Sequence, residues 1–150
     1  MQRAQAAGAW AVINYHEENI VQQLLSLTDG KKVRVVYDSI GKATWEDSLN
    51  CLRPRGLMVS FGNASGPVTG VDLALLNQKG SLYVTRPSLK DYVTSRDTLD
   101  IASQQLFALM ASGAISAEIP EQQRFPLRDA VQAHRLLESR QTQGSCLLIP

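Results

Sequence analysis

The sequence predicts an α/β fold built on a doubly wound parallel sheet, a partial Rossmann-like arrangement. Strand-like and helix-like segments alternate along most of the 150 residues, as expected for parallel strands joined by crossover helices. The clearest strand, Val33–Ser39, is rich in β-branched residues and apolar on both faces, which is typical of a sheet covered on both sides. Neither G-x-G-x-x-G nor G-x-x-x-x-G-K-[ST] occurs, so the first strands and the glycine loop of a nucleotide-binding sheet are missing.

The first elements follow from apolar spacing and from turn residues. Residues 1–7 are rich in Ala and Gln, which favours a helix, and Gly8 is placed to end it. Periodicity then predicts, in order, strand Trp10–Tyr15, helix Glu17–Leu27, strand Val33–Ser39, helix Thr44–Leu52 and strand Leu57–Phe61. A chain that opens inside a helix is expected to be the distal part of a longer enzyme.

The later elements are read in the same way. They begin with helix Leu73–Gln78, capped by Asp72, and strand Ser81–Arg86, stopped by Pro87. A long helix follows from Thr94–Asp97 to Gly113, and its buried stripe is expected to be Leu99, Ala102, Leu106, Leu109 and Met110. The last elements are edge strand Ile115–Ile119, helix Pro126–Ser139 and strand Ser145–Ile149. The alternation breaks after Gly113. We therefore expect a partial dinucleotide-binding domain over residues 1–113 and a separate C-terminal segment over residues 114–150.

Composition excludes several classes of function. Hydrophobic residues make up 44% of the chain. The net charge is +1 and Lys and Arg are scattered, so the sequence predicts no positive electrostatic field that would attract nucleic acid or an anionic membrane. Cys51 and Cys146 lie far apart, without metal-ligand spacing, and are expected to be two buried thiols. No signal peptide or membrane-spanning apolar run is visible, which predicts a cytoplasmic protein.

Candidate binding residues lie where the predicted strands end, because ligands of open α/β sheets bind beyond the carboxyl ends of the strands. These ends carry Tyr15, Ser39, Phe61-Gly62-Asn63 and Pro87. The pattern also fits ordinary transitions from strand to loop. Tyr15 has the alternative of a half-buried aromatic rather than an adenine platform, and Gly62 that of a tight turn rather than a nicotinamide contact. Asp38 suits a turn aspartate better than a ribose ligand, since no glycine loop precedes it.

Catalytic side chains are not predicted. His16 is expected to be solvated and His134 to be structural, so neither a catalytic dyad nor a metal site is expected. Ser60 and Ser65 lack the G-x-S-x-G context of a hydrolase.

Four segments together resemble the medium-chain dehydrogenase/reductase superfamily, and within it the zeta-crystallin-like NADPH:quinone oxidoreductases. They are A-G-A followed by V-I-N-Y at residues 7–15, V-Y-D-S-I-G at 36–41, G-L-M-V-S-F-G-N at 56–63, and the ending P-L-x-x-A-x-x-A-H-x-x-L-E-S…G at 126–144. The resemblance spans the whole chain and the distal half of the family's length.

The resemblance implies a parent enzyme that uses NADPH to reduce a quinone, with this half inactive by itself. It implies that Tyr15 contacts the adenosine end of NADPH and that Ser39 and Ile40 line the crevice. Phe61, Gly62 and Asn63 would contact the nicotinamide side, Pro87 would lie near the same pocket, and Arg140 would reach a cofactor phosphate or ribose. It also implies no zinc, no catalytic acid or base, and a segment 114–150 that rejoins a substrate domain.

A homodimer through the edge strand Ser81–Arg86 is also expected, because this almost uncharged run ends its sheet and a bare edge invites pairing. The alternative is a monomer with that edge covered by the Thr94–Ser112 helix. Other functions stay open: an enoyl or alcohol reductase of the same superfamily, or a non-catalytic assembly module. A methyltransferase-like sheet would not explain the A-H-x-x-L-E-S ending.

Overall fold

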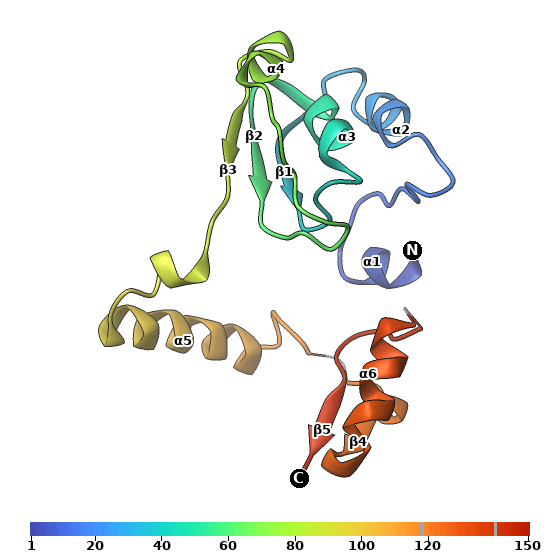
Figure 1. The fold of residues 1–150 in the computed structure, drawn as a ribbon, viewed down its shortest axis with the longest axis vertical. Coiled ribbons are helices and arrows are strands. Elements are labelled where there is room, and N and C mark those ends of the chain that lie inside the picture. The colour runs from blue at the N-terminus through green and yellow to red at the C-terminus, as the bar shows by residue number, and fades with distance from the viewer. Residues whose placement is uncertain (118, 140) are drawn as a thin grey trace. The chain divides into compact units, whose positions relative to one another are not determined.

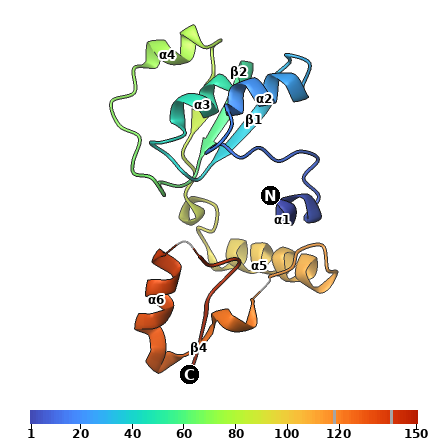
Figure 2. The same cartoon turned by 90° about the vertical axis from the view of Figure 1, so that its right-hand side faces the viewer.

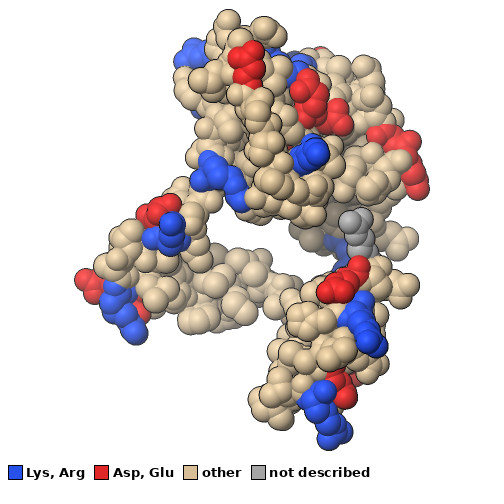
Figure 3. Space-filling view, viewed as in Figure 1, with Lys and Arg blue, Asp and Glu red and all other residues tan. Residues whose placement is uncertain are grey.

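The computed structural model describes residues 1–117, 119–139 and 141–150, and it divides into two units (Figure 1). The first unit is Met1–Tyr92 and the second is Val93–Pro150. Each unit is described by itself below. Among the described residues, no helix is long and apolar enough to cross a bilayer. On the face drawn in Figure 3, acidic and basic side chains are interspersed rather than segregated.

A three-stranded parallel sheet organises the first unit. Its strands are β1 (Val33–Asp38), β2 (Leu52–Ser60) and β3 (Tyr83–Thr85), hydrogen-bonded in the order β1-β2-β3. The helices of the unit are α1 (Gln2–Ala6), α2 (Ile20–Leu27), α3 (Trp45–Asn50) and α4 (Leu73–Gln78), with a 3-10 turn, η1, over Leu89–Asp91. Parallel strands joined by helices confirm the predicted α/β fold class.

Helices cover one face of this sheet. Figure 2 shows α2 and α3 on the same side of the strands. The fully buried side chains Leu49, Leu52 and Met58 form the core with Leu82. Tyr37 and Tyr83 occupy the other face and are 73% and 58% exposed. Side-chain direction alternates along a strand, so the same strands present a buried face and an open one.

Several predictions in this unit are wrong. Strand β2 begins at Leu52 instead of Leu57, and helix α3 ends at Asn50 instead of Leu52. The segment Trp10–Tyr15 is irregular rather than a strand, because it has no neighbouring strand to complete a ladder among the described residues. Helix α2 begins at Ile20 instead of Glu17, since Asn19 caps it by accepting a 3.0 Å hydrogen bond from the Gln22 amide.

The second unit contains a long helix and a small parallel sheet. Helix α5 (Arg96–Ala111) starts with a capping box between Ser95 and Thr98. The sheet pairs β4 (Arg124–Pro126) with β5 (Leu147–Ile149), and helix α6 (Ala130–Glu138) connects them. The 3-10 turns η2 (Glu121–Gln123) and η3 (Leu127–Asp129) flank β4.

The α5 stripe predicted to be buried is exposed: Leu99, Leu106, Leu109 and Met110 each keep more than two fifths of their surface accessible. An amphipathic pattern shows that a face is apolar, but burial requires a surface to pack against. The sequence also fails to predict β4, because three residues ending in Pro126 carry almost no periodicity. Residues 115–117 form no strand, and residue 118 of the predicted Ile115–Ile119 strand lies outside the described residues.

Candidate functional site

The carboxyl end of β1 is organised by one buried carboxylate, Asp38, which is 4% exposed. One oxygen accepts from the backbone amides of Ile40 at 2.7 Å and Gly41 at 2.9 Å. The other accepts from the hydroxyls of Thr44 and Ser48, each at 2.7 Å. These bonds join the strand to the turn after it and to the start of α3, so the turn-aspartate interpretation is confirmed.

The same four hydrogen bonds decide the ionisation of Asp38. Burial alone raises the pKa of the carboxyl, because it disfavours a charge away from water. The hydrogen bonds from Ser48, Thr44, Gly41 and Ile40 outweigh burial and hold the pKa below its ordinary value. Asp38 is therefore a stable anion near neutral pH, which suits a structural acceptor and not a proton donor.

Two loops meet beyond the ends of β1 and β2. The Phe61 amide donates to the Asp38 carbonyl at 2.8 Å, and the Ser65 amide donates to the Ile40 carbonyl at 2.7 Å. Gly62 lies so close to Ser39 that a Cβ on Gly62 would come within 2.8 Å of the Ser39 Cα. A larger residue at Gly62 would therefore push the two loops apart.

Gly41 makes a second close approach between these loops. It has a φ of 89° and faces the Gly66 carbonyl, which a Cβ at Gly41 would approach to 2.7 Å. Both glycines are therefore required by the close backbone contact between the two loops, whether or not a ligand binds above them.

A hollow of about 440 Å³ opens beside Asp38 and the loop that follows β1. Tyr15, Ser39 and Ile40 line it, as does His16, whose ring lies 4.3 Å from the Tyr15 ring, centroid to centroid. The structure thus brings three of the predicted binding residues to one place. An exposed aromatic ring beside a hydroxyl and an apolar wall suits a nucleoside, with its planar base and ribose hydroxyls.

The remaining predicted residues lie outside this hollow or outside the description. Phe61 is 51% exposed, Asn63 is exposed and Pro87 is half-buried, and none of them lines the hollow. Arg140 lies outside the described residues. No Lys or Arg occurs among the described residues that line the hollow, so its walls suit a nucleoside better than a phosphate.

Sequence reasoning missed the hydroxyls that hold Asp38. Thr44 and Ser48 are four residues apart at the start of α3, so both reach the same carboxylate. Arg86 was missed as well: its guanidinium donates to the Ser60 carbonyl at 2.9 Å and joins the ends of β3 and β2. A strand-final aspartate followed by hydroxyl residues at helical spacing is the signal that points to the first of these contacts.

A sequence model of zinc-binding dehydrogenases matches residues 7–148. The chain belongs to this family. A quinone oxidoreductase of Salmonella typhimurium is 66% identical over 149 residues, which are 99% of this chain and 46% of that protein. A 2-haloacrylate reductase of Burkholderia is 40% identical over 98% of this chain and 44% of its own length. The chain thus spans about half the length of these relatives.

Solved structures of the family have the same fold. The crystal structure of Escherichia coli quinone oxidoreductase complexed with NADPH matches 99% of this chain with a TM-score of 0.94 and 65% identity, over 46% of its own chain. The crystal structure of 2-haloacrylate reductase matches with a TM-score of 0.87 at 39% identity, over 46% of that chain. These matches support a partial Rossmann-like sheet.

The described thiols and acids are dispersed. In the part of the chain that the structure describes, no three His, Cys, Asp or Glu side chains are grouped to hold a metal ion. Cys51 and Cys146 are free thiols; Cys51 is buried as predicted, whereas Cys146 is half-buried. Burial, together with the nearby charge of Asp47, raises the pKa of the Cys51 thiol.

Proposed function

We propose that this chain supplies half of the cofactor cleft of an NADPH-dependent quinone reductase. One observation carries the proposal: 66% identity to a quinone oxidoreductase over 99% of the chain. The hollow beside Asp38 supports it, because it lies at the carboxyl end of a parallel sheet, where dinucleotides bind in such folds. The 40% identity to 2-haloacrylate reductase favours a second candidate, the reduction of an activated carbon–carbon double bond.

In this proposal the chain binds and orients the cofactor. Tyr15 lies against the adenosine end, and Ser39 and Ile40 form the wall of the crevice. Phe61, Gly62 and Asn63 approach the nicotinamide side, with Pro87 near the same pocket and Arg140 on a cofactor phosphate or ribose. The rigid contact between residues 39–41 and 62–66 supports the nicotinamide assignment, since hydride transfer needs a fixed ring.

NADPH, when bound, supplies the hydride that reduces the quinone. The chain's own task is to hold the dinucleotide and to keep its crevice in shape. Asp38 serves this task by fixing the turn at residues 39–41 without contacting the reacting atoms. We further propose that residues 1–113 belong to the cofactor domain, that residues 114–150 pack with a substrate domain, and that the enzyme is cytoplasmic.

We also propose a homodimer joined through β3. This strand is at the edge of its sheet, and all three of its residues are exposed. A two-fold axis would pair the strand with its own copy. Light scattering should show a dimer for the wild type and a monomer for Tyr83→Pro, which removes a ladder donor; a wild-type monomer at every concentration would contradict the proposal.

The decisive experiment joins this chain to the amino-terminal part of the E. coli quinone oxidoreductase, in place of the segment that it matches. We expect the chimera to consume NADPH with 1,4-benzoquinone, whereas the 150-residue chain alone should not. Circular dichroism confirms folding, and the intact E. coli enzyme is the positive control. A folded chimera that reduces 2-chloroacrylate and no quinone would favour the second candidate.

The same chimera tests the binding residues. Arg140→Ala should weaken NADPH binding about tenfold, the typical loss of one charge-assisted hydrogen bond. Tyr15→Ala should have a smaller effect, since it removes only a stacking contact. Quenching of protein fluorescence measures both dissociation constants, and an unchanged value removes that residue from the site.

A further inference from the structure

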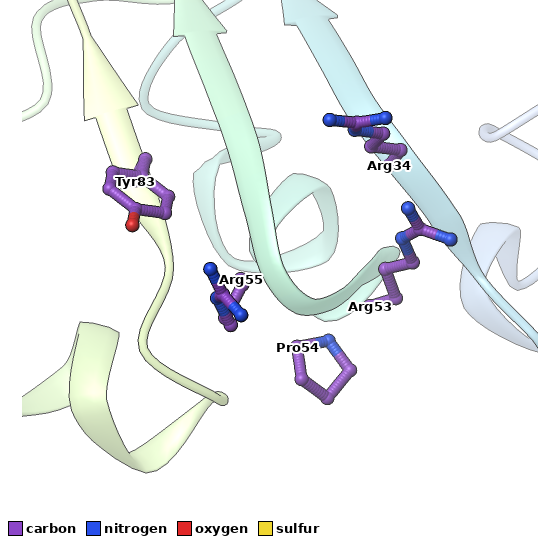
Figure 4. Close-up of a pocket in the computed structure, with 5 residues that line it drawn as sticks. All are labelled: Arg34, Arg53, Pro54, Arg55 and Tyr83. Carbon is purple, nitrogen blue, oxygen red and sulfur yellow. The ribbon is translucent and has the colours of Figure 1, made fainter.

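The amino-terminal end of the first-unit sheet carries a second pocket, of about 510 Å³, lined by Arg34, Arg53, Pro54, Arg55 and Tyr83. These residues come from the starts of β1, β2 and β3 (Figure 4). Figure 4 shows Arg55 between β2 and β3, with Tyr83 on one side and Arg34 and Arg53 on the other. The hollow beside Asp38 shares none of these residues.

A bulge in β2 places Arg53 and Arg55 around the same pocket as Arg34. Leu52 pairs with Val33 and Leu57 pairs with Val35, so the four residues 53–56 stand opposite Arg34 alone. Pro54 suits such a bulge because it has no amide for the ladder. Extra residues in one strand turn their side chains out of the regular pleat. Figure 4 shows Arg53 on the same side of β2 as Arg34, and Arg55 on the side that faces β3.

The bulge is held in a strained conformation. Arg55 has a φ of 59°, in the left-handed region that a residue with a Cβ rarely adopts. Its amide donates to the Gly80 carbonyl at 2.7 Å, and Gly80 lies so close to Pro54 that a Cβ at Gly80 would come within 3.0 Å of the Pro54 Cα. Such strain persists where the surroundings fix it, and it often marks a functional site.

The positive charge of this pocket has no acidic partner within the described ranges. No described carboxylate lies at ion-pair distance from Arg34, Arg53 or Arg55, whereas Arg96 and Arg124 each have one. Gathering like charges without counter-charges costs stability. A guanidinium group can donate two parallel hydrogen bonds to two oxygens of one phosphate. The exposed Tyr83 ring offers a surface on which a planar base can stack.

We propose that this pocket is a second anion site, which binds the diphosphate group of a nucleotide with the base against Tyr83. The three arginines match adjacent phosphate groups, and the strained bulge holds two of them in place before the ligand arrives. The site shares no residue with the crevice proposed for NADPH, so it does not depend on that crevice; it shares Tyr83 with the strand proposed to join the dimer.

Isothermal titration of the chain with pyrophosphate and with ADP tests the site. An ionic strength of about 0.1 M is suitable, because salt then screens charges more than about 10 Å apart. We expect saturable binding of one equivalent of each ligand. Arg53→Gln and Arg55→Gly should each weaken it about tenfold, the loss of one charge-assisted contact. Arg55→Gly also relieves the left-handed strain, so circular dichroism should show that it remains folded.

The assignment to a nucleotide has its own test. ADP should bind about fivefold more tightly than pyrophosphate, and Tyr83→Leu should remove that difference.

Two controls distinguish a specific site from a general attraction between anions and a basic chain. Arg96→Gln makes the same change of net charge on α5 and should leave both affinities within about twofold, because Arg96 does not line the pocket. Tyr15→Ala alters the NADPH crevice and should leave the affinity for pyrophosphate unchanged; ADP binding that is weakened by Tyr15→Ala and not by Arg53→Gln belongs to that crevice and not to this pocket. No saturable binding, or equal weakening by Arg96→Gln, would overturn the site, and equal affinities for ADP and pyrophosphate would overturn its assignment to a nucleotide.

Discussion

The two ends of the same parallel sheet treat their charged groups in opposite ways. At the carboxyl end, Asp38 is buried and its carboxylate accepts four hydrogen bonds. At the amino end, Arg34, Arg53 and Arg55 are exposed and line a pocket without an acidic partner among the described residues. The carboxylate at one end is hydrogen-bonded within the fold, whereas the arginines at the other end have no described partner of opposite charge.

This difference separates scaffold from binding surface. A buried charge must be hydrogen-bonded, and its partners are then fixed in position, which is how Asp38 shapes the loop between β1 and α3. Exposed charges that are clustered and unpaired keep their donors available for a ligand. Asp38 therefore supports the crevice, while the arginines are positioned to bind something themselves.

Removing Asp38 should have the largest effect on stability. Asp38→Ala leaves two amides and two hydroxyls without their acceptor, so we expect a loss of about 3 kcal/mol in the free energy of unfolding. Urea denaturation followed by circular dichroism measures it. The matched control is Asp72→Ala: Asp72 is an exposed cap that accepts one side-chain bond from the Ala74 amide, and its loss should cost about 1 kcal/mol. Equal losses for the two variants would contradict the special role of Asp38.

Acid should lower the free energy of unfolding by a smaller amount than Asp38→Ala does, because a protonated Asp38 carboxyl keeps part of its hydrogen bonding. The pKa of Asp38 is lowered from 3.8 in the folded state, so its ionisation stabilises the fold above pH 3.8. That contribution is lost as the pH falls below 3.8 toward the lower folded-state pKa. Asp38→Asn cannot titrate, so the stability difference between wild type and variant should shrink at acid pH. A difference independent of pH would show that the carboxylate charge does not matter.

The sequence predicts the parts of this comparison unevenly. Apolar spacing is enough to find β1, and the order D-S-I-G is enough to identify Asp38 as a turn aspartate. The arginine pocket is invisible to such reasoning, because a bulge opposite Arg34 creates it and a bulge has no periodicity. The Trp10–Tyr15 and α5 predictions are wrong for a related reason: pairing and burial depend on a partner surface, which a local pattern does not contain. The cofactor-binding roles remain predictions for all eight residues: Tyr15, Ser39, Ile40, Phe61, Gly62, Asn63, Pro87 and Arg140.

The smallest effect should come from Arg55, and it should have the opposite sign. The left-handed region costs a residue other than glycine roughly 1 kcal/mol, and Arg55→Gly removes this cost. Glycine also gives the unfolded chain more entropy, which offsets part of the gain, so the variant should be more stable by about 0.5 kcal/mol. Arg53→Gly is the matched control, since Arg53 has no positive φ and the same change there relieves no strain. That control should lose about 0.5 kcal/mol. The two substitutions make the same chemical change two residues apart, so a difference in sign isolates the backbone. If Arg55→Gly destabilises the chain as much as Arg53→Gly does, the bulge is not strained. The amino end of the sheet then holds three ordinary surface arginines and no longer contrasts with the carboxyl end.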